Sequence, residues 1–121
     1  NLIEQTFDEG NFDTHQQLLM RDFSFSSPFG NFSNVEDYMT WLKSFYQNVL
    51  AQGGTRHLIT NPIVKITNDE ALCFSYLVIL NRKSMTFMGT SVLQDRLQRV
   101  NGVWRCKTRV IESDQFSPEQ N

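Results

Sequence analysis

The hydrophobic period of the sequence changes at Gly53–Gly54, and no other feature constrains the fold as strongly. Before these glycines, apolar residues recur three and four positions apart, which is the pattern of one helix face. After them, apolar and polar residues alternate, as in strands with one buried face. Helices followed by a run of strands predict an α+β domain, with the helices on one face of a sheet. The length of 121 residues is that of one domain, predicted to span residues 1–121.

The longest predicted helix ends at the two glycines. Ser33 and Glu36 have the spacing of a capping box, and apolar residues follow at helical spacing over residues 35–50. Two shorter helices are predicted upstream. The first resembles the last turns of a helix that enters from a truncated N-terminus and ends near Gly10, and the second covers residues 13–21.

A short predicted strand at residues 23–26 precedes the long helix, and four long strands follow it. These four are predicted over residues 56–65, 71–80, 85–100 and 103–113. Asn61–Pro62 predicts an irregularity in the first of them, because proline has no N–H for the strand ladder. Asn101–Gly102 is a strong hairpin signal between the last two.

Composition excludes several classes of function. The net charge of -2 and the pI near 5.6 argue against a basic nucleic-acid binder. No run of 18 apolar residues indicates a membrane span, so we expect a cytoplasmic protein. Cys73 and Cys106 are predicted to be reduced core thiols. The sequence has no glycine-rich phosphate loop, nucleophile elbow or zinc motif, so we expect neither a cofactor nor a metal.

The last predicted strand separates an apolar side from a basic side. The first side would carry Trp104, Cys106, Thr108 and Val110, and the second would carry Arg105, Lys107 and Arg109. The second half of the chain is the more basic half, and this side accounts for most of its excess. We expect a solvated face or a contact between subunits there.

Three residues are candidates for chemistry. Asp95 shares the more apolar face of its strand, which suits a pocket wall or a cross-strand ion pair. His57 has the same parity as Ile59 and points to the core if that residue does, as a pocket residue or a structural histidine. Asp8 lies at the edge of the first helix's apolar stripe, where a carboxylate is usually solvated. His15 lies among polar residues and is expected to be solvated.

Ten Phe, three Tyr and two Trp are more rings than so small a core needs. We therefore predict that some of them line a pocket for a small hydrophobic molecule. The predicted lining residues are Phe7, Phe23, Tyr38, Trp41, Phe74, Tyr76, Phe87 and Trp104. A carboxylate and imidazole set beside such rings suits proton transfer on an apolar molecule.

Several segments together resemble the SnoaL-like part of the NTF2-like superfamily. They are Phe7–Phe12 with Asp22, Thr55–Val64, Ala71, Gly89–Asp95, Arg99–Arg105 and Arg109, which cover nearly the whole chain. The resemblance implies a cone: a strongly curved, mixed or antiparallel sheet wrapped around N-terminal helices, with an internal pocket. It also implies a homodimer through the outer sheet face.

The superfamily includes scytalone dehydratase, ketosteroid isomerase, polyketide cyclases and non-catalytic binding domains, so the fold does not specify the reaction. His57 matches the pocket histidine of dehydratase-like members, Asp8 their helix carboxylate, and Asp95 a polar strand position. The enzyme hypothesis is a cofactor-independent lyase or isomerase acting on a cyclic apolar substrate. In it His57 is the base, Asp95 orients His57, and Asp8 is the acid.

Phe7 departs from the dehydratase pattern, which has a tyrosine near the helix carboxylate. The alternative hypothesis is therefore a non-catalytic ligand-binding domain, or a β-type small subunit of a ring-hydroxylating dioxygenase that supports a larger catalytic subunit. In that case the polar groups only orient a ligand or satisfy one another. Tyr38 or Tyr76 would have to supply any catalytic hydroxyl.

Overall fold

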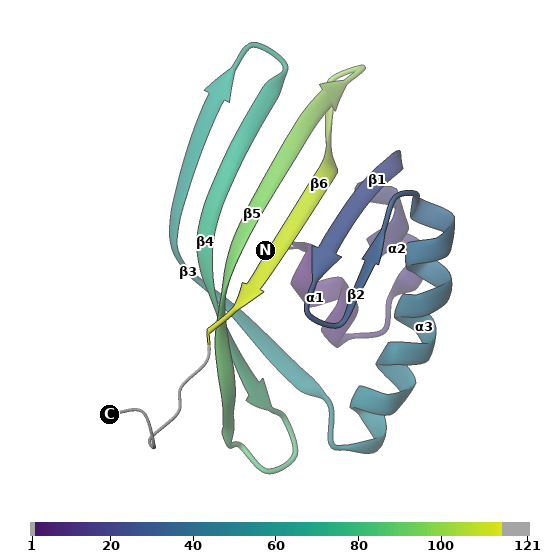
Figure 1. Ribbon diagram of the computed structural model, residues 1–121, viewed down its shortest axis with the longest axis vertical. Coiled ribbons are helices and arrows are strands. Elements are labelled where there is room, and N and C mark those ends of the chain that lie inside the picture. The colour runs from purple at the N-terminus through teal and green to yellow at the C-terminus, as the bar shows by residue number, and fades with distance from the viewer. Residues whose placement is uncertain (1, 115–121) are drawn as a thin grey trace.

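The computed structural model describes residues 2–114, which form three helices and six strands (Figure 1). The helices are α1 (Leu2–Asp8), α2 (Phe12–Gln17) and α3 (Val35–Ala51). The strands are β1 (Leu19–Ser27), β2 (Gly30–Phe32), β3 (Thr55–Thr67), β4 (Glu70–Asn81), β5 (Phe87–Val100) and β6 (Val103–Ser113). None of these helices is long and apolar enough to cross a membrane.

The strands form one sheet in the order β2-β1-β6-β5-β4-β3. β1 runs parallel to β6, and every other neighbouring pair is antiparallel. The long strands bend, and the helices lie together on one side of the sheet (Figure 1). The α+β class and the curved mixed sheet were both predicted, and both are confirmed. The sequence did not predict β2.

α3 covers the predicted residues, but its cap differs from the predicted one. Asn34 is the N-cap, and its Oδ1 accepts a hydrogen bond of 2.8 Å from the backbone N–H of Asp37. Gly53 and Gly54 end the helix with φ values of 118° and 78°, where a side chain would be strained. Ser33, the N-cap predicted from the sequence, is the residue before the observed N-cap.

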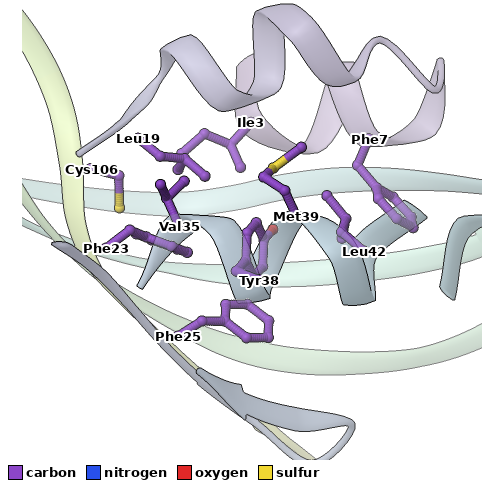
Figure 2. Packing of buried hydrophobic residues seen from close by; sticks show 10 residues of the cluster. All are labelled: Ile3, Phe7, Leu19, Phe23, Phe25, Val35, Tyr38, Met39, Leu42 and Cys106. Atoms are coloured by element: carbon purple, nitrogen blue, oxygen red, sulfur yellow. The ribbon is translucent and has the colours of Figure 1, made fainter. Parts of the chain in front are cut away.

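The hydrophobic core lies between α3, α1 and the β1–β6 part of the sheet (Figure 2). Tyr38 is at its centre, with ring centroids 4.9 Å from Phe23 and 4.8 Å from Phe25. The core consists of Ile3, Phe7, Leu19, Phe23, Phe25, Val35, Tyr38, Met39, Leu42 and Cys106. These side chains fix the helices over the inner face of the sheet, which is the face that carries the candidate site.

A bulge in β6 changes which side chains face inward. Leu97 pairs with Cys106 but Arg96 pairs with Thr108, so Lys107 has no partner on β5. The extra residue inverts the alternation beyond it. Arg109 is therefore buried on the inner face, as Cys106 is, and the prediction that Arg109 belongs to the basic outer side was wrong.

Candidate active site

α1 and the start of β3 bring Asp8 and His57 together. The Nδ1–H of His57 donates to Oδ1 of Asp8 at 2.6 Å, and the backbone N–H of His57 donates to Oδ2 at 2.8 Å. Thr55 Oγ1 also donates to Oδ1, at 2.9 Å. Thr55 and His57 are two residues apart on one strand and so present the same face to the helix. One carboxylate is thus held by two residues of β3.

These bonds fix the imidazole in one tautomer. Because Asp8 can only accept, the proton lies on Nδ1 of His57, and Nε2 carries a free lone pair. Nε2 has no hydrogen-bond partner among residues 2–114 and is not sealed from solvent. The His57 side chain is 14% exposed and that of Asp8 only 3%. This is the arrangement of a base with an orienting carboxylate behind it.

Aromatic rings flank the imidazole. The Phe7 ring meets His57 edge to face, with centroids 5.7 Å apart, and lies 6.1 Å from Phe45. Phe45 in turn stacks on Trp41 at 4.9 Å and contacts Phe29 at 5.5 Å. The rings connect the imidazole to α3 and to the β1–β2 turn, and they give the site apolar surroundings.

Gly89 lies on the inner face at the same level of the sheet as His57. His57 pairs with Ile79, and Ile79 pairs with Gly89. A Cβ atom added at Gly89 would meet nothing within 4 Å. There is consequently open space on the inner face two strands from the imidazole.

Asp95 does not contact His57. Its carboxylate accepts two hydrogen bonds of 2.8 Å, from Nε and Nη2 of Arg109, its register partner on β6. Arg109 also donates from Nη1 to Glu4 of α1. Asp95 is thus the cross-strand ion-pair partner that the sequence left open, and its expected role of orienting His57 was wrong.

The pKa of Arg109 reflects this pairing. Burial acts to lower it, but the carboxylates of Asp95 and Glu4 outweigh burial and raise the pKa well above that of a free guanidinium. Two buried carboxylates share this one guanidinium. Oε2 of Glu4 has no partner among the described residues.

His15 is buried, contrary to the prediction that it is solvated. Its Nδ1–H donates to the Ile3 carbonyl at 3.1 Å and lies 2.9 Å from Thr6 Oγ1, while Nε2 accepts from the Tyr38 hydroxyl at 2.9 Å. Burial, with help from the charge of Arg109, lowers the pKa of His15 to about 4. The hydroxyl of Tyr38 is occupied in this network and does not replace the missing tyrosine at Phe7.

The rings predicted to line a pocket divide into three groups. Phe7, Phe23 and Tyr38 are buried in the core, with Trp41 packed against it. Phe74 and Tyr76 lie on the outer face, because they alternate with the inward residues Cys73 and Leu77, so their prediction was wrong. Phe87 is exposed beyond a register shift in β5, and Trp104 stacks on Arg99 at 5.1 Å.

No other group in the described part of the chain offers catalytic chemistry of comparable geometry. Residues 2–114 contain no cluster of His, Cys, Asp and Glu that could hold a metal ion. Cys73 and Cys106 are free, and burial raises the pKa of each thiol. Sequence reasoning missed two partners in the site region, Thr55 and Glu4. Their spacing, two residues from His57 and four from Asp8, was the available signal.

The curved mixed sheet with N-terminal helices on one face is the NTF2-like, cystatin-like fold. Within it, the sequence profile of the SnoaL-like domain matches residues 4–110, so the chain belongs to the SnoaL-like family. A search of curated proteins gave no match.

Solved structures agree with this assignment at the level of the fold. A protein of unknown function from Nostoc punctiforme, with a cystatin-like fold, is 24% identical with a TM-score of 0.80, covering 97% of this chain and 86% of its own. An NTF2-like protein from Novosphingobium aromaticivorans is 17% identical with a TM-score of 0.81, covering 97% and 78%. A putative scytalone dehydratase from the same organism is 18% identical with a TM-score of 0.76, covering 93% and 77%.

Proposed function

We propose that the protein catalyses cofactor-independent proton transfer, as a lyase or isomerase, on a small cyclic apolar substrate. The observation that carries the proposal is the 2.6 Å hydrogen bond between His57 Nδ1–H and Asp8, which leaves Nε2 unbonded beside a row of rings. A neutral imidazole can accept a proton and return it near neutral pH. The similarity to a putative scytalone dehydratase supports this class of reaction.

In the proposed reaction, Nε2 of His57 removes a proton from the carbon next to a carbonyl. The electron pair of that C–H bond moves toward the carbonyl oxygen, and Asp8 stabilises the positive imidazolium. The imidazolium then returns its proton. In a lyase it protonates a hydroxyl on the neighbouring carbon as the C–O bond breaks and water leaves. In an isomerase it protonates a different carbon.

The role of Asp8 follows from its contacts. Three hydrogen bonds converge on its carboxylate, from Thr55 Oγ1 and from the ring and backbone nitrogens of His57. A carboxylate that accepts in this way has no proton to donate to a leaving group. We therefore assign Asp8 to orienting the imidazole, in place of the acid role that the sequence suggested.

Proton exchange on a simple probe tests the proposal without the natural substrate. In D₂O, the wild-type protein should accelerate loss of the α-proton signal of a bicyclic ketone such as 2-tetralone in NMR spectra. His57→Ala should reduce that rate to background, and Asp8→Asn should reduce it by about 10³- to 10⁴-fold. Asp69→Asn, which removes an exposed ion pair with Arg99, is the control that should retain the rate. Full exchange activity in His57→Ala would refute the assignment.

One observation favours a second candidate, a non-catalytic ligand-binding domain or a small subunit of a larger enzyme. The ring beside His57 is Phe7, which has no hydroxyl to polarise a carbonyl. Under this reading, His57→Ala would leave ligand affinity and proton exchange unchanged. Purification from its native cells would then give a hetero-assembly with a larger catalytic subunit.

A further inference from the structure

α1 reaches the sheet through two acidic side chains. Glu4 and Asp8 are four residues apart, so both project from the same side of the helix. Both reach the sheet, Glu4 at Arg109 of β6 and Asp8 at Thr55 and His57 of β3. α1 is therefore anchored to the sheet at two positions one turn apart, each by a carboxylate.

The anchor at Glu4 is fixed from the sheet side. Asp95 and Arg109 are register partners on β5 and β6, and the two bonds of 2.8 Å orient the planar guanidinium. Nη1 of Arg109 remains to meet Glu4. All three side chains are buried. The direction of approach of α1 is thus set by a group that is held independently of α1.

An ionic anchor here is not needed for stability alone. Buried ion pairs are often matched or exceeded in stability by apolar side chains of similar volume. This one also leaves Oε2 of Glu4 without a partner among residues 2–114. A buried ion pair does fix the relative orientation of its side chains, because its hydrogen bonds break when the groups rotate.

We propose that Glu4, Arg109 and Asp95 form a positioning clamp that fixes α1 so that Asp8 meets His57 in hydrogen-bonding geometry. The inference rests on the proposed function, because it assigns these residues to support the His57–Asp8 pair. None of the three touches the reacting atoms. They act one helical turn away, through the backbone of α1 between Glu4 and Asp8.

The test reads the His57 ring directly by ¹⁵N-resolved NMR, which requires no substrate. In the wild type, His57 should be a single Nδ1–H tautomer with a slowly exchanging ring proton. Glu4→Ala should broaden or lose that signal, because Asp8 no longer has a fixed position. Glu4→Gln should restore it, since its amide oxygen can still accept from Arg109. Cys106→Ala, in the core close to the clamp, is the control for a general loss of packing and should retain the signal.

Proton exchange on 2-tetralone gives the second readout. Displacement of a catalytic group by about 1 Å costs on the order of 10²-fold in rate. Glu4→Ala should therefore lower kcat by about 10- to 100-fold, with KM changed by less than about twofold, and Glu4→Gln should recover most of it.

Failure of the clamp and failure of the proposed function give different results. If Asp8→Asn removes the His57 ring signal and Glu4→Ala leaves both signal and kcat unchanged, the clamp is wrong and the pair stands. If Asp8→Asn leaves the ring signal unchanged, the pair itself is wrong. Loss of the signal in Cys106→Ala as well would show a nonspecific packing effect and overturn the clamp.

Discussion

His15 makes a testable contribution to acid sensitivity. It is 1% exposed, neutral, and bonded to Tyr38 and Thr6, and burial lowers its pKa from 6.5 to about 4. The unfolded chain therefore binds a proton at this residue between pH 6.5 and 4 while the folded protein does not. The stabilising effect of a neutral His15 is present above pH 6.5, decreases as the pH falls, and is lost by pH 4. A shift of this size corresponds to about 3 kcal/mol.

Urea unfolding at pH 7.0, 5.5 and 4.5 measures this effect. His15→Gln keeps a hydrogen-bonding side chain at the position but cannot titrate. The variant should be less stable than the wild type at pH 7.0, and the gap should narrow by about 2 to 3 kcal/mol at pH 4.5. The carboxylates titrate in both proteins, so their contribution cancels in the difference. A gap that stays constant across this range would contradict the assignment.

The burial and the partners of single side chains were the hardest features to predict from the sequence. The inward direction of a strand residue follows from parity, so His57 could be placed on the inner face. Its partner could not, because Asp8 and Asp95 were both acids of the right kind, and only the packing of α1 distinguishes them. His15 was misjudged because its sequence neighbours are polar. Its burial depends on the hydroxyl of Tyr38, which is 23 residues away.

At the scale of elements, the start of α3 provides a matched pair of variants. Asn34 caps the helix by accepting a hydrogen bond from the backbone N–H of Asp37. Ser33 fits the sequence pattern of a capping box but is not the N-cap. Asn34→Ala should destabilise the protein by about 1 kcal/mol, because it leaves a helix N–H without its acceptor. Ser33→Ala should have an effect below about 0.5 kcal/mol. Both values come from urea midpoints, and equal losses would refute the cap assignment.

The long elements were predictable, and the irregularities within them were only partly so. Period and glycine signals located α3 and the four long strands to within a few residues. Asn61–Pro62 predicted the irregularity in β3, where the register shifts and Asn61 has a φ of 51°. The bulge at Lys107 has no such marker, since no glycine or proline stands there. It is this bulge that turns Arg109 inward and creates the anchor for Glu4.

At the scale of the whole molecule, the outer face of the sheet is not covered by any of the described helices and exposes apolar side chains. It exposes Leu58, Ile63 and Tyr76, which form an apolar centre on β3 and β4. Lys65 and Arg96 lie toward one end of this face and Arg56 toward the other, and Glu112 is level with Tyr76. An exposed apolar centre surrounded by polar and charged side chains is typical of a surface that pairs with another protein chain. We propose that a homodimer forms through this face.

Two adjacent residues of β3 test the proposed dimer. Ile63 is 57% exposed and pairs with Phe74 of the outer face, whereas Val64 is 55% exposed and pairs with Cys73, which neighbours the buried Asp95 of the inner face. Ile63→Lys would bring like charges into the centre of a twofold interface, because each copy supplies one. It should weaken the dimer at least tenfold in sedimentation equilibrium. Val64→Lys adds the same charge at the same exposure on the opposite face and should leave the dimer intact. Equal weakening by both variants would show that the dimer contact is elsewhere. A wild-type protein that sediments as a monomer at about 100 μM, a concentration at which even weak specific dimers form, would refute the proposed dimer.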